Sequence, residues 1–230
     1  MVCLILSLIG GEIGIWEIIG AVISAVAVIF LAMPVHEFAH AFIADKLGDP
    51  TPRYQGRLTL NPIAHIDPIG ALGILLFGIG WAKSVNVNAR YFKSPKWGMA
   101  LTALAGPVSN FIMAFISVFL MVLLEFIGEK TGFSGIAAEV IGAFFEYLAI
   151  INIMLGVFNL IPIPPFDGSR ILFAFLPTRA YFAIMKYERF IFIGLIILFA
   201  TRILNVPLNL ITRVVYYAFY SVASLPFMFI

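Results

Sequence analysis

The feature that most constrains this chain is a long apolar run at residues 13–44, which ionisable side chains interrupt at only a few positions. A helix needs about 20 mostly apolar residues to cross a bilayer, and this run exceeds that length. Similar runs occur at residues 97–126 and 137–161. Because a helix satisfies its own backbone hydrogen bonds in lipid, we expect the chain to cross a membrane several times as helices.

The overall composition supports the same conclusion. Hydrophobic residues make up 62% of the 230 residues and charged residues only 11%, whereas a soluble domain averages roughly 45–50% and 25%. Such a chain has too little polar surface for a soluble enzyme, so its surroundings are expected to be the lipid bilayer. The formal net charge of +2 is too small to indicate a nucleic-acid partner.

The predicted fold class is an all-α polytopic membrane protein with about five transmembrane helices, or six as the alternative. We expect one integral-membrane domain that covers residues 1–230. Its expected parts are a first helix at residues 13–46, a loop at 47–96, core spans at 97–171 and additional helices at 172–230.

The loop after the first span has its own pattern. Residues 54–60 and 84–92 alternate between apolar and polar side chains, which is typical of half-buried strands and predicts a small membrane-associated β element. Residues 68–80 between them are apolar, but a segment of about 13 residues is too short to span a bilayer. We interpret it as a re-entrant or interfacial segment.

The basic residues predict the orientation. Half of all Lys and Arg lie in the loop between the first two spans, and basic loops stay on the cytosolic side. We therefore expect residues 47–96 to face the cytosol, with positions 36–40 toward the cytosolic end of the first span.

The motif that carries chemistry is His36-Glu37-Phe38-Ala39-His40. On a helix, positions i and i+4 share one face, so both imidazoles can bind one Zn²⁺ ion. Glu37 lies beside them and can take a proton from water. The alternative is a pair of packing histidines, but ionisable groups inside a span are costly and mark functional sites.

Two histidines leave a catalytic zinc one protein ligand short. Asp167 is the leading candidate for that ligand because it follows a proline-rich stretch at the end of the third span, in NLIPIPPFDGSR. The prolines hold that segment out of a helix, and Gly168 lets the backbone turn. From the residues alone, a turn in which Asp167 only caps the next helix is equally plausible.

Together these motifs resemble the site-2 protease family of intramembrane zinc metalloproteases, in its small prokaryotic branch without PDZ or CBS domains. The resemblance covers about residues 32–171 and includes NPIAHIDPIG, FGIGWAK and AGPVSN. It implies that His36, His40 and Asp167 bind Zn²⁺ and that Glu37 is the general base. It also implies a transmembrane-helix protein substrate and a prokaryotic cytoplasmic membrane. One departure is SVNVN at residues 84–88, where relatives tend to carry proline.

Two further residues are candidates for contacts to the substrate or its oxyanion. His65 lies near Asp67 in the loop and could polarise the scissile carbonyl, pair with Asp67 to lock the loop, or serve as an auxiliary metal contact. Asn159 lies at the end of the third span, where its amide could bind an unwound substrate backbone.

The sequence therefore predicts an intramembrane zinc metalloprotease that hydrolyses peptide bonds within or near transmembrane helices. The main alternative is a divalent-cation or proton transporter that uses the same intramembrane His, Glu and Asp. Transporters often have two related halves, and the chain has no internal duplication. An inactive scaffold is disfavoured by the intact HExxH motif.

Overall fold

The structure is a computed structural model that describes residues 14–77, 81–201 and 204–228. Four helices in this part are long and apolar enough to cross a membrane. These helices are Ile15–Lys46, Pro95–Thr131, Ile136–Asn159 and Val206–Phe227. The expected first three spans thus form long helices, which confirms an all-helical membrane protein. Residues 78–80 of the FGIGWAK motif lie outside the described residues.

The first span consists of three joined segments, α2 (Ile15–Ala27), the π-helix η1 (Val28–Ala32) and α3 (Met33–Lys46). Three residues of η1 are buried, and they form an apolar cluster with Leu148 of α8 (Ile136–Asn159): Val28, Ile29 and Ala32. Along the span, α2 packs mainly on α8, whereas α3 packs on α7 (Pro95–Thr131).

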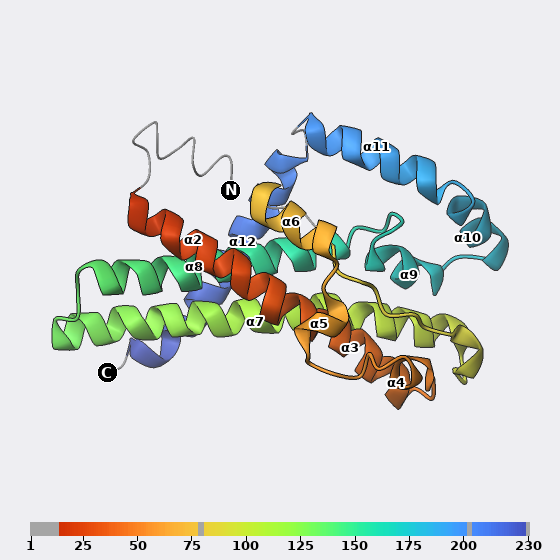
Figure 1. The fold of residues 1–230 in the computed structure, drawn as a ribbon, viewed down its shortest axis with the longest axis horizontal. Coiled ribbons are helices and arrows are strands. Elements are labelled where there is room, and N and C mark those ends of the chain that lie inside the picture. Colours follow the sequence, from red (N-terminus) through yellow and green to blue (C-terminus); the bar gives the residue numbers. More distant parts are fainter. Residues whose placement is uncertain (1–13, 78–80, 202–203, 229–230) are drawn as a thin grey trace.

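The long helices form a bundle whose two ends differ. Figure 1 shows α7 and α8 lying side by side, with α2 across them and α12 (Asn205–Ser224) crossing behind. Helix α3, the first turns of α7 and the short helix α9 (Asp167–Phe173) meet at one end. The residues of the HExxH motif and the Asp-Gly motif are therefore brought to the same end of the bundle.

Small residues allow the helices to approach closely, as in other membrane bundles. A Cβ at Gly20 of α2 would lie 2.7 Å from the Cβ of Ala143 and 3.0 Å from the Phe144 nitrogen of α8. The Ser24 hydroxyl lies 2.7 Å from the Phe144 carbonyl oxygen, which links the same two helices. This contact fixes the first span against α8.

The remaining elements are short. The loop after the first span contains α4 (Thr51–Tyr54), α5 (Pro62–His65), α6 (Pro68–Phe77) and the 3₁₀ turn η2 (Ala89–Tyr91). The C-terminal third contains α10 (Thr178–Met185), α11 (Glu188–Ala200) and the 3₁₀ turn η3 (Leu225–Phe227). The 13 residues of α11 reach only about 20 Å, less than the bilayer core. The described residues therefore contain four candidate spans, against the predicted five.

The predicted β element is wrong for the described residues. They contain one isolated antiparallel bridge, Ile66 to Ala82, and no strand. In the first segment, Tyr54 is the last residue of helix α4 and Gly56 turns the chain with φ +67°. In the second segment, the Val85 and Asn88 amides donate hydrogen bonds to side-chain carboxylates and not to a neighbouring strand.

Gly20→Ala is expected to lower the free energy of unfolding by about 1–3 kcal/mol, because the new methyl group overlaps α8. The thermal unfolding midpoint of the purified protein in detergent would fall by a few degrees. Gly142→Ala on α8 is the matched control, since its added Cβ meets nothing within 4 Å. If the two variants unfold at the same temperature, the close α2–α8 contact is not important for stability.

Candidate metal centre

Helix α3 presents the two histidines of the motif on one face. The Nε2 atoms of His36 and His40 lie 3.0 Å apart, and the two rings meet edge to face. Both residues are buried, with 9% and 7% of their surface exposed. The i, i+4 spacing thus directs two ligand nitrogens at one point, as the sequence predicts.

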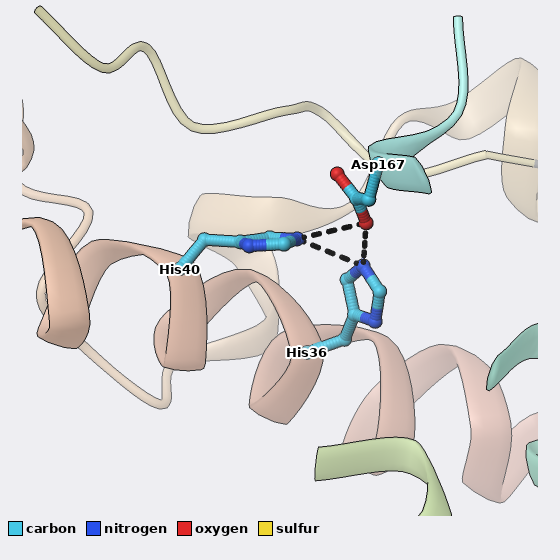
Figure 2. Close-up of side chains that lie close together, drawn as sticks. All are labelled: His36, His40 and Asp167. Atoms are coloured by element: carbon cyan, nitrogen blue, oxygen red, sulfur yellow. Dashed lines mark hydrogen bonds and ion pairs between the residues drawn. The ribbon is translucent and has the colours of Figure 1, made fainter. Parts of the chain in front are cut away.

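Asp167 reaches the same point from the first residue of α9. Its Oδ2 lies 3.4 Å from Nε2 of His36 and 3.2 Å from Nε2 of His40. Figure 2 shows the three side chains converging from α3 and α9. Gly168 permits this approach, because a Cβ there would overlap the carbonyls of Leu160 and Ile161.

The local charges keep Asp167 in the form that binds metals. Burial favours the neutral carboxyl, but the neighbouring imidazoles of His40 and His36 outweigh burial and hold the pKa of Asp167 well below its usual range. The carboxylate is therefore ionised at neutral pH, as a metal ligand must be.

The three atoms fit a zinc ion. Zn–N and Zn–O bonds of about 2.0–2.1 Å in a tetrahedron place ligand atoms about 3.3 Å apart. The observed separations are 3.0, 3.4 and 3.2 Å, and these side chains form a group able to hold a metal. A zinc ion held by these three side chains would keep one coordination position open, which is the arrangement of catalytic rather than structural zinc sites.

Helix α7 supports the histidines from the other side. Nδ1 of His40 lies 2.7 Å from the Thr102 carbonyl oxygen, a contact that fixes the tautomer and leaves Nε2 free for a metal. Gly106 lies one turn further along α7, and a Cβ there would overlap both imidazole rings. Only glycine lets α7 pack this closely against the two ligands.

Glu37 lies between the ligands in sequence and is also buried, with 7% of its surface exposed. Its Oε2 accepts a hydrogen bond of 3.0 Å from the backbone N–H of Val85. One carboxylate oxygen is thus held by the loop that follows α6, in a position next to the metal ligands.

The other two predicted residues lie apart from the ligand group. His65 is fully buried, and its Nε2 lies 2.8 Å from the Thr59 carbonyl oxygen. Asp67 instead caps α6, since its Oδ1 accepts from the Ile69 and Gly70 amides at 2.9 and 3.0 Å. The His65–Asp67 pair, one of the alternatives for His65, is therefore absent from the described ion pairs. The described contact of the His65 ring is to its own loop.

Asn159 is the last residue of α8 and is partly buried. Its Nδ2 donates a hydrogen bond of 3.0 Å to the Leu155 carbonyl oxygen one turn earlier. The side chain is thus bound to its own helix, a few residues before the loop that leads to Asp167.

The Thr102 carbonyl and the Val85 amide could not be predicted from the sequence, because every residue has a backbone carbonyl and every residue except proline has a backbone N–H. Gly106 was visible in the AGPVSN segment, and the structure gives the reason for its small size.

Comparisons with known proteins agree with this geometry. The model of Peptidase family M50 matches residues 24–201. YwhC of Bacillus subtilis (strain 168), named as a zinc metalloprotease, is 43% identical over 178 residues, 76% of this chain and 80% of that protein. Rip2 of Mycobacterium tuberculosis (strain H37Rv), named in the same way, is 31% identical over 192 residues, 81% of this chain and 70% of that protein. No solved structure matches the chain significantly.

The chain therefore belongs to peptidase family M50, the site-2 protease family. The family match extends from the last turn of α2 through α11 and contains the HExxH segment as well as Asp167. The family resemblance drawn from the motifs is confirmed.

Gly106→Ala is expected to weaken zinc binding about 10- to 100-fold, because the added methyl group displaces the two imidazoles. Competition with a chromophoric chelator would measure the zinc dissociation constant of the purified protein. Gly142→Ala is again the matched control, as its Cβ enters open space. Equal zinc affinity in the two variants would contradict the close packing of α7 on the ligands.

Proposed function

We propose that this zinc metalloprotease hydrolyses peptide bonds within or near transmembrane helices of membrane-protein substrates. The observation that carries the proposal is the location of the ligand group. His36, Glu37 and His40 lie inside the first membrane-spanning helix, where ionisable side chains are rare unless they function. A site buried at this depth suits substrates that are themselves in the membrane.

In this proposal His36, His40 and Asp167 hold Zn²⁺, and the separations of their ligand atoms support this assignment. When bound, the zinc ion polarises the scissile carbonyl and lowers the pKa of water toward about 7. Glu37 takes the proton from the attacking water as general base. It then returns this proton to the leaving amine.

The contact between Glu37 and Val85 supports this assignment. Because Oε2 already accepts the Val85 N–H at 3.0 Å, the other carboxylate oxygen is the one available for the proton. A carboxylate fixed through one oxygen has less freedom to turn away from the water, so the hydrogen bond helps to orient the base.

The two outlying residues take supporting roles. We assign Asn159 as a contact to the unwound backbone of the substrate, since a helix must open before its carbonyls can be attacked. We assign His65 to the loop itself, where its buried ring and its contact to Thr59 hold the segment that carries the Asp67 cap. A direct contact of His65 to the oxyanion is the alternative.

We further propose that the chain is a single domain in a prokaryotic cytoplasmic membrane, with the active site toward the cytosol. The support is the basic loop next to the HExxH end of the first span, because basic loops stay on the cytosolic side. The transporter alternative is not favoured, because the chain belongs to a peptidase family and its carboxylate beside the ligands suits hydrolysis.

Glu37→Gln is expected to abolish cleavage while zinc stays bound, because the amide cannot accept the proton but His36, His40 and Asp167 are intact. Purified wild type and variant would be incubated in detergent with a tagged single-span reporter, and the zinc content of both would be measured. Loss of activity by about 100-fold or more is expected for a general base.

Equal cleavage by both proteins would contradict the role of Glu37. A different result would support the transporter alternative. In that case both proteins retain zinc, neither cleaves the reporter, and the protein carries zinc or protons across the membrane of vesicles.

A further inference from the structure

The end of helix α3 is closed by a backbone motif that places one carboxylate inside the protein. The Asp49 amide donates to the Ala44 carbonyl at 2.9 Å, and the Gly48 amide donates to the Asp45 carbonyl at 3.1 Å. Gly48 has a φ of +106°, so this is the Schellman arrangement, in which glycine is strongly favoured. The motif turns the chain so that Asp49 is fully buried, with 0% exposure.

The Asp49 carboxylate binds backbone amides with both oxygens. Oδ1 accepts from the Thr51 amide at 3.0 Å, which starts helix α4. Oδ2 accepts from the Asn88 amide at 2.6 Å. The second contact is long-range in sequence and joins the end of α3 to the loop after α6. Hydrogen bonds to an ionised carboxylate are the stronger ones in proteins.

Helix α3 therefore holds the same loop at two points. The Val85 amide donates to Glu37 in the middle of the helix, and the Asn88 amide donates to Asp49 just past its end. Tyr91, a little further on, places its carbonyl oxygen 3.4 Å from where a Gly48 Cβ would lie. Only Asn86 and Val87 lie between the two anchored amides, so a displacement of Asn88 is passed to Val85 through a two-residue segment.

We propose that Asp49 is a positioning residue for the general base: by anchoring Asn88, it keeps the Val85 N–H on Glu37. The described hydrogen bonds of the Asp49 carboxylate go to the Thr51 and Asn88 amides and not to the ligand group, so Asp49 acts only through the loop. The kinetic consequence rests on the proposed role of Glu37, whereas the structural link between Asp49 and Val85 does not.

The structural link is tested by amide hydrogen exchange resolved at Val85 and Asn88. In Asp49→Ser the hydroxyl can still accept from Thr51 but is too short to reach Asn88. Exchange at both amides is expected to accelerate by about an order of magnitude. The matched control is Asp45→Ser, which removes a 2.7 Å ion pair to Arg53 near the same helix end and should leave both amides protected.

A second pair of variants removes the same contact from the loop side, in case Asp49→Ser does not fold. Asn88→Pro deletes the donor, whereas Asn88→Ala keeps the N–H and removes only the side chain, whose Oδ1 accepts from Arg90. Faster exchange at Val85 in the proline variant alone supports the link. Acceleration at Asn88 without any change at Val85 in Asp49→Ser, or equal acceleration in Asp45→Ser, overturns it.

The kinetic consequence is tested by a double-mutant cycle on reporter cleavage. Asp49→Ser alone is expected to lower kcat about tenfold with KM and zinc content unchanged. When Val85→Pro has already removed the donor to Glu37, adding Asp49→Ser should lower kcat by less than about twofold. A full tenfold loss in both backgrounds, or a loss of zinc, would show that Asp49 acts through general stability and overturn the proposal.

The two experiments separate this proposal from the proposed function. Hydrogen exchange does not depend on proteolysis, so it reports on the link between Asp49 and Val85 even if no reporter is cleaved. If exchange at Val85 changes but wild type cleaves nothing, the proposed function fails and the structural link stands.

Discussion

The contact on which the rest of this structure depends is the meeting of His36, His40 and Asp167 within 3.4 Å of one another. Charged and polar ligands in a membrane-spanning helix are unfavourable unless they are paired or bind a metal. The fold meets this requirement by bringing the start of α9 back to the face of α3. The proline-rich segment before Asp167 and the absence of a side chain at Gly168 and Gly106 make that approach possible.

The ligand side chains could be predicted from the sequence because their chemistry fixes their identity and spacing. Two histidines four positions apart in a helix must share a face, and only a few carboxylates lie near enough in depth to complete the group. The long membrane spans could also be predicted from the sequence, since their length and apolar composition define them. For Asp167, the residues alone left a helix cap as an alternative, and the family resemblance decided the assignment before the geometry agreed with it.

The loop between α3 and α7 could not be predicted in the same way. Its alternating side chains indicate strands, but a strand needs a partner for its backbone amides. Here the Val85 and Asn88 amides donate hydrogen bonds to the carboxylates of Glu37 and Asp49 instead. Side-chain acceptors that lie far away in sequence compete with strand pairing, and no local pattern reveals them. The same holds for the Thr102 carbonyl behind His40, which any residue could have supplied.

The π-helix Val28–Ala32 gives the first span a further property. An α-helix advances about 100° per residue, and a π turn takes up one additional residue. The extra residue rotates α3 about the helix axis relative to α2. Helix α2 can therefore pack on α8 while α3 packs on α7. One continuous helix thereby serves two interfaces with different orientations. The direction in which the HExxH face of α3 points thus depends on the π-helix that precedes the motif.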